Sequence, residues 1–189
     1  MIELPVGGNV YLKDMGIQTE HIILNISWKT PKLAAPQISF GGFMMNNLKQ
    51  VNALTDFVGR HNNLSNCGTL AWLGGDDAYQ AMRINLNHLM QSENKRIVFL
   101  VYAQYYQNRK LTFRYIDNVK IQLFDEDLQC LVTHDIPKSL SANTIVCAEL
   151  YLYQGKIKFK ACHHAYQDGL LSLTKHNGWQ DFLLNTTTN

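Results

Sequence analysis

Alternation of apolar and polar residues with a period of two is the feature that most constrains the fold of this chain. Ile22, Leu24 and Ile26 lie on one side of an extended segment, with His21 and Asn25 on the other. The same alternation occurs over three segments, 21–28, 119–124 and 156–161. Because successive side chains of a strand point to opposite faces, each segment is predicted to be a half-buried strand.

A longer apolar run, residues 96–102, is predicted to be a central strand that is covered on both faces. Tight turns are predicted at Tyr153–Lys156, where a glycine is free to take a positive φ, and at Phe124–Asp127. Helical signals are confined to residues 85–90 and 168–177. Many short strands between turns predict a mainly β fold, an antiparallel β-sandwich with one or two short helices.

Composition and charge narrow the classes of function. The 17 basic and 15 acidic residues give a net charge of only +2, so a dedicated nucleic-acid binder is not expected. The longest strongly apolar run, residues 97–103, is too short for a transmembrane segment, which needs about 20 residues. The chain is predicted to be a single domain, residues 1–189.

Four cysteines without a CxxC pair predict reduced thiols in a cytoplasmic protein, and residues 1–5 do not read as a secretory signal. Charged residues make up 17% of the chain, below the usual share of about 25%. A surface with so few charges resists association poorly, so a protein partner or self-association is expected.

Several short motifs follow one another in a characteristic order. They are Gly7-Gly8-Asn9-Val10-Tyr11-Leu12, the strand that ends in Trp28, Gly74-Gly75-Asp76-Asp77, Glu149-Leu150-Tyr151 and Tyr166-Gln167-Asp168-Gly169-Leu170. In order and spacing they resemble the TerD-domain proteins of tellurite resistance and general stress response, over about residues 7–179. The resemblance implies a non-enzymatic cytoplasmic β-sandwich that acts with protein partners in a stress-response complex.

The resemblance also implies calcium, which family members bind between loops at one end of the sandwich. Calcium takes six to eight oxygen ligands, so clustered carboxylate and amide oxygens on loops suit it. The positions to which the resemblance carries this site are Asp76 and Asp77, together with the amide oxygens of Asn62, Asn63 or Asn66.

This chain departs from the family pattern at positions where the family has acidic residues that could bind calcium. Gln37 and Ser39 replace the two aspartates of the Asp-Leu-Asp motif, Ala78 replaces an acidic residue after Asp77, and Lys29 stands beside Trp28. Because calcium affinity follows the charge and number of the ligands, the site is predicted to be weakened or lost. Two hypotheses follow: an interaction module with a degenerate calcium site, or a calcium-responsive module that retains the ion at the Gly-Asp-Asp loop.

A third hypothesis is a small-ligand-binding β-sandwich that uses exposed tyrosines in residues 102–106 and 151–153. These rings could equally pack within the sheet. The alternating residues Lys156, Lys158 and Lys160 are read as a solvated strand face, which could also protect an edge or meet an acidic partner.

Signals for catalysis or a transition metal are weak. Cys162 and His164 would share one face of a strand, with His163 on the other, but no second Cys/His pair completes a zinc site. His134-Asp135 suggests half of a catalytic triad without any recognisable nucleophile. The Gly-Asp-Asp turn also resembles that of palm-type polymerases, but the surrounding segments lack the required helices. No enzyme is predicted, and the role of the Cys162–His164 segment is left open.

Overall fold

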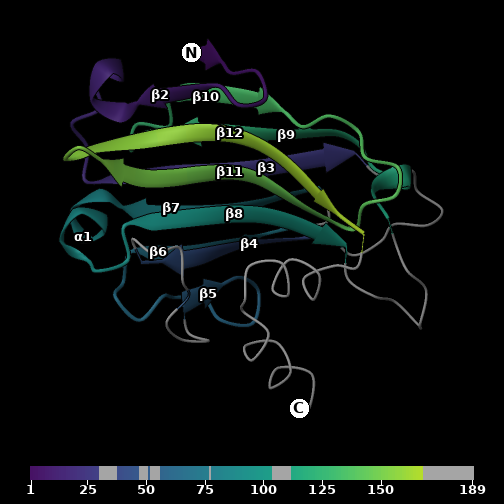
Figure 1. Cartoon of the computed structure of the whole chain (residues 1–189), viewed down its shortest axis with the longest axis horizontal. Coiled ribbons are helices and arrows are strands. Elements are labelled where there is room, and N and C mark those ends of the chain that lie inside the picture. The colour runs from purple at the N-terminus through teal and green to yellow at the C-terminus, as the bar shows by residue number, and fades with distance from the viewer. Residues whose placement is uncertain (30–37, 47–50, 52–55, 77, 104–111, 168–189) are drawn as a thin grey trace.

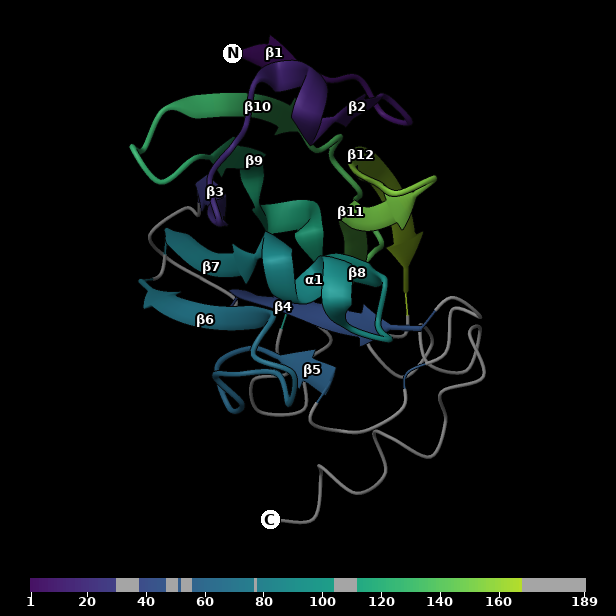
Figure 2. The ribbon, with the colours of Figure 1, turned by 90° about the vertical axis from the view of Figure 1, so that its left-hand side faces the viewer.

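The protein is a sandwich of two six-stranded sheets, which face each other as two layers (Figures 1 and 2). The computed structural model describes residues 1–29, 38–46, 51, 56–76, 78–103 and 112–167. Every neighbouring pair of strands is antiparallel except β1 and β10, which are parallel. The mainly β sandwich predicted from the alternation is therefore confirmed.

The first sheet, sheet A, has the strand order β1-β10-β9-β3-β7-β6. Its strands are β1 (Ile2–Glu3), β3 (His21–Lys29), β6 (Leu70–Gly75), β7 (Tyr79–Asn85), β9 (Asp117–Phe124) and β10 (Cys130–Asp135). The second sheet, sheet B, has the order β2-β12-β11-β8-β4-β5. Its strands are β2 (Asn9–Tyr11), β4 (Ile38–Met45), β5 (Phe57–Val58), β8 (Arg96–Ala103), β11 (Thr144–Tyr153) and β12 (Lys156–Tyr166).

Three short helices are present in the described part of the chain. The α-helix α1 (Leu86–Gln91) covers one end of the sandwich between β7 and β8 (Figure 2), and the 3-10 helices are η1 (Leu12–Met15) and η3 (Phe113–Tyr115). The side chain of Asn85 caps α1 by accepting a hydrogen bond of 2.8 Å from the backbone N–H of His88. The short helix predicted at residues 85–90 is confirmed, and the one predicted at residues 168–177 lies outside the described residues.

The main core lies between the two sheets and follows the predicted alternation. In β3 the buried residues are Ile22, Leu24, Ile26 and Trp28, and in β9 they are Val119, Ile121 and Leu123. Central strand β8 is buried on both faces, as predicted. Its residues Ile97, Phe99 and Val101 belong to the main core, whereas Val98, Leu100 and Tyr102 belong to a second apolar cluster on the outer face of sheet B.

Both predicted turns join adjacent strands. Tyr153 pairs with Lys156, so Gln154 and Gly155 form a two-residue hairpin between β11 and β12, with φ of 49° and 73°. Positive φ at both positions gives the hairpin the twist of its flanking strands. The second turn joins β9 to β10, where the carboxylate of Asp125 accepts a hydrogen bond of 2.8 Å from the backbone N–H of Gln129.

Candidate functional site

Asp76 lies in the turn between β6 and β7, and its carboxylate is used by the turn itself. Its Oδ1 atom accepts hydrogen bonds from the backbone N–H groups of Ala78, at 2.7 Å, and Tyr79, at 2.9 Å. Gly75 has a φ of 147°, and a Cβ atom there would lie 2.1 Å from the Tyr79 carbonyl oxygen. The sequence Gly-Gly-Asp thus has a structural explanation that needs no metal. Asp77 lies outside the described residues.

The predicted asparagine ligands lie in the segment between β5 and β6. The side chain of Asn62 donates a hydrogen bond of 2.7 Å to the carbonyl oxygen of Phe57, and the carbonyl oxygen of Asn63 accepts one of 2.9 Å from the N–H of Trp72. Trp72 is four residues before Asp76, a distance of about 13 Å along a strand. Two oxygens on one calcium ion lie within about 5 Å of each other, so this register does not place Asn63 beside Asp76.

Asn66 belongs to the turn that precedes β6 and also has a bonding partner. In the described part of the chain, no group of three or more histidine, cysteine, aspartate or glutamate side chains could hold a metal ion. Whether calcium binds therefore stays a prediction, and the residue types present would supply few charged ligands.

A buried glutamine is the main feature of this end of the sandwich that sequence reasoning missed. Gln80 on β7 is only 5% exposed. Its Nε2 atom donates to the carbonyl oxygen of Ile38 at 3.0 Å, and its Oε1 atom accepts from the N–H of Phe40 at 2.8 Å. The amide thereby joins β7 of sheet A to β4 of sheet B. The sequence offered one signal for this cross-link: Gln80 lies two residues before the apolar Met82, so it falls on the face of the strand that points into the core.

Position 39, where the family pattern has an aspartate, is buried in this chain. Ser39 is 1% exposed, and its cross-strand partner on β8 is Tyr102. A carboxylate here would lose its solvation without a cation to compensate. Position 37 lies outside the described residues.

The His134-Asp135 pair does not form part of a triad. His134 is buried, with its Nδ1 atom 2.9 Å from the carbonyl oxygen of Leu4 and its Nε2 atom 3.3 Å from that of Cys162. The ring therefore links the N-terminal segment, β10 and β12. Asp135 instead forms an ion pair of 3.1 Å with Lys120.

The Cys162–His164 segment is also used structurally. Burial raises the pKa of the Cys162 thiol to about 12, and the nearby charge of Glu149 adds to this shift. The Nε2 atom of His163 lies 3.0 Å from the hydroxyl of Ser139. Burial, together with the nearby His134 and His164, lowers the pKa of His163.

Cys67 differs from these buried thiols. Burial acts to raise its pKa, but hydrogen bonds from Thr69, Ser65 and Ser92 outweigh burial and lower it below its ordinary value. Its Sγ atom lies 3.0 Å from the hydroxyl oxygen of Thr69. A partly exposed thiol with a lowered pKa is the most reactive kind of cysteine in a folded protein.

The predicted tyrosines divide into two groups. Tyr102 is buried in the second apolar cluster, and residues 104–106 lie outside the described residues. Tyr151 and Tyr153 lie on the outer face of sheet B, where each ring contacts a cation. The guanidinium carbon of Arg96 is 4.5 Å from the centre of the Tyr151 ring, and the Nζ atom of Lys158 is 5.5 Å from that of Tyr153.

Fold and motifs together define a β-sandwich domain in which the most conspicuous polar residues hold turns and sheets in place. A sequence profile of the TerD domain matches residues 1–176, so this chain belongs to the TerD domain family. None of the helices in the described part of the chain has the length and hydrophobicity that a membrane crossing requires.

Three relatives are similar to this chain over most of their own length. Tellurium resistance protein TerD of Serratia marcescens is 25% identical over 187 residues, which cover 94% of this chain and 97% of the relative. Chemical-damaging agent resistance protein B of Clostridium acetobutylicum is 29% identical over 131 residues, covering 65% and 94%. General stress protein 16U of Bacillus subtilis (strain 168) is 22% identical over 190 residues, covering 95% and 98%.

Proposed function

We propose that this protein acts in resistance to chemical stress such as tellurite, as a non-enzymatic cytoplasmic module that binds another protein. The names of its relatives support the stress role, because they include tellurium resistance, chemical-damaging agent resistance and general stress proteins. In this proposal the calcium site is weakened or lost, and binding to a protein partner does not depend on the ion.

The observation that carries the proposal is how polar groups are used at the β6–β7 end of the sandwich, where the resemblance placed the calcium site. The Asp76 carboxylate accepts two backbone N–H groups of its own turn, and the Gln80 amide bonds directly to β4. A neutral amide and a self-contained turn hold this end together by direct hydrogen bonds. Calcium would add little, because carboxylates that provide affinity elsewhere in the family are replaced here.

Thermal unfolding tests the calcium part of the proposal. The protein is first treated with EDTA and then titrated with calcium chloride to millimolar concentration, with magnesium as the control. A ligand that binds only the folded state at a hundredfold excess over Kd stabilises by about 2.7 kcal/mol. For a domain of this size, that would raise Tm by about 5–10 °C. We expect no saturable shift; a shift that Asp76→Ala abolishes would establish the calcium-responsive alternative.

Partner capture tests the interaction part. Cells that carry the tagged protein are treated with tellurite and then with a cross-linker, and co-purifying proteins are compared with and without EDTA. We expect a defined partner whose recovery is unchanged by EDTA, and greater tellurite resistance in cells that express the protein. Equal resistance with and without the protein would refute the stress role.

A further inference from the structure

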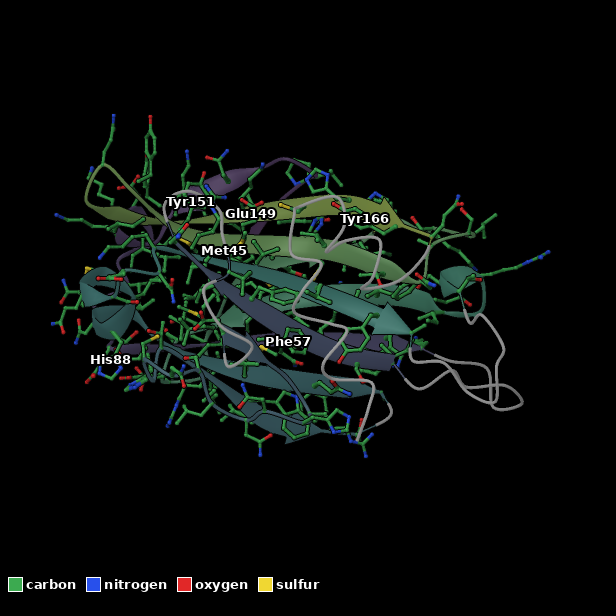
Figure 3. The ribbon with its side chains drawn as sticks, turned by 60° about the horizontal axis from the view of Figure 1, so that its bottom comes forward. Met45, Phe57, His88, Glu149, Tyr151 and Tyr166 are labelled. Carbon is green, nitrogen blue, oxygen red and sulfur yellow. The ribbon has the colours of Figure 1, made fainter. Side chains whose placement is uncertain are left out.

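One half of the outer face of sheet B combines cations with aromatic rings in a fixed register. Tyr11 of β2 pairs with Lys158 of β12, Lys158 with Tyr151 of β11, and Tyr151 with Arg96 of β8. Residues paired in this way share a face, so an aromatic–cation–aromatic–cation row crosses four neighbouring strands. In Figure 3, Tyr151 and Glu149 lie side by side on this face, with Met45 of the neighbouring β4 nearby.

We propose that this cationic face binds an acidic, extended segment of a partner protein, an inference that rests on the proposed function. The cationic face is defined by Tyr11, Arg96, Tyr151, Lys156, Lys158 and Lys160. The proposal assigns a surface and a partner chemistry to the interaction module.

The rings hold the lysines without using their hydrogen-bond donors. The Nζ atom of Lys158 lies 4.8 Å from the centre of the Tyr11 ring, and that of Lys156 lies 5.5 Å from it. A cation over a ring is attracted by the ring's π electrons, whereas its N–H groups stay available to an incoming acceptor. The ammonium groups are thus held in place beforehand, which lowers the entropy lost on binding.

The cationic face has little negative charge of its own. Glu149 lies on the same face, where it forms an ion pair with Arg96 and is the cross-strand partner of Lys160. Among the described residues, no carboxylate forms an ion pair with Lys156, Lys158 or Lys160. By contrast, Lys120 of β9 and Lys138, which follows β10, are each paired with an aspartate. Within the described part of the chain, Lys156 and Lys158 are therefore the cations of this face that have no carboxylate as an ion-pair or cross-strand partner.

The spacing of the lysines favours an extended acidic chain over other anions. Lys156, Lys158 and Lys160 are alternate residues of one strand, so their Cα atoms repeat at about 6.6 Å. An extended peptide that lies over the outer face of β12 and runs parallel to this strand presents every second side chain at the same repeat. Its carboxylates can therefore meet the lysine ammonium groups one to one. A membrane surface has no such repeat. Beside the cationic face, the ring of Tyr153, which pairs with Lys156, is 47% exposed, and one such ring gives little apolar area for insertion into a membrane.

The test measures binding of a fluorescein-labelled oligoglutamate peptide by anisotropy at several salt concentrations. The face variant carries Lys156→Gln, Lys158→Gln and Lys160→Gln. The matched control carries Lys29→Gln, Lys120→Gln and Lys138→Gln, which removes the same charge from sheet A and its end. Circular dichroism verifies that both variants fold. If the face variant does not fold, the single variant Lys158→Gln takes its place in the test.

We expect the face variant to weaken peptide binding about tenfold, which corresponds to about 1.4 kcal/mol, and the control to weaken it less than about twofold. Equal weakening by both variants would refute the proposal, because net charge alone would then explain binding. Absence of binding by the parent protein would also refute it. A third result would also refute the proposal: the face variant no longer binds phosphatidylserine vesicles but still binds the peptide. The cationic face would then bind a membrane.

Partner capture with the face variant separates this inference from the proposed function. If the cross-linked partner is still recovered with the variant, the assignment of the cationic face fails while the interaction module stands. If no partner is recovered even with the parent protein, the proposed function itself fails.

Discussion

Substitution of Gln80 by leucine removes the amide that joins the two sheets, and its effect on stability can be worked out from the structure. Strand β5 covers β4 only at Gly42 and Phe43. At Ile38 and Phe40 the Gln80 amide takes the place of a neighbouring strand, since it accepts from one residue's N–H and donates to the other's carbonyl. The leucine variant leaves both backbone groups without this partner.

Each buried backbone group that loses its partner costs about 1–3 kcal/mol. The more apolar leucine side chain returns about 1 kcal/mol by burial. The expected net loss is therefore about 3 kcal/mol in the free energy of unfolding, or a fall in Tm of about 6–12 °C for a domain of this size. Thermal and urea unfolding measure the loss, and hydrogen exchange of the Phe40 amide reports on the cross-link directly.

The matched control is Gln122→Leu. Gln122 lies on β9 of sheet A, is only half-buried, and makes a weak contact of 3.8 Å with the sulfur of Cys130. Its replacement by leucine should change stability by less than about 0.5 kcal/mol. If Gln80→Leu loses no more stability than Gln122→Leu, or if exchange of the Phe40 amide is unchanged, the inferred cross-link is wrong.

Two further predictions concern titratable groups. Cys67 should react with iodoacetamide at neutral pH well before the buried Cys147 and Cys162, because its pKa is lowered and theirs are raised. Mass spectrometry after brief alkylation of the folded protein measures the order of reaction. Alkylation of Cys162 at the same rate as Cys67 would contradict this prediction. Burial lowers the pKa of His163 from 6.5, so the unfolded chain takes up a proton at a pH where the folded chain does not. Stability should therefore fall as pH drops below about 6.5, and this fall should be smaller in His163→Gln in urea unfolding at pH 7 and pH 5; an equal fall in both proteins would exclude this cause.

The strands at residues 21–28, 96–102, 119–124 and 156–161 could be predicted from the sequence because each carries its own pattern of apolar residues. Alternation placed Ile22, Leu24 and Ile26 inward without reference to any other part of the chain. The short helix at residues 85–90 and the hairpin at Gln154-Gly155 were likewise found from local sequence, the hairpin because a glycine there tolerates positive φ.

Features that depend on register could not be predicted from the sequence. That Tyr11 meets Lys158 is decided by pairing between strands far apart in the chain, and no local pattern specifies it. Gln80 looked like an ordinary polar residue, because the backbone groups that it satisfies belong to the other sheet. The residues expected to bind calcium were found by resemblance, and the internal use of the Asp76 carboxylate emerged only from the geometry of its turn.

The edges of both sheets bear on the order in which the protein folds during synthesis. The N-terminal strands β1 and β2 pair with β10 and β12, which the ribosome makes much later. The carbonyl oxygen of Leu4 likewise has no hydrogen bond with the ring of His134 until β10 has been made. Sheet A therefore cannot be completed until β10 has left the ribosome, and sheet B cannot be completed until β12 has. Strands β1 and β2 stay without these partners while the strands between are made. A nascent chain of this kind depends on late closure, in which the first residues made are among the last to reach their places.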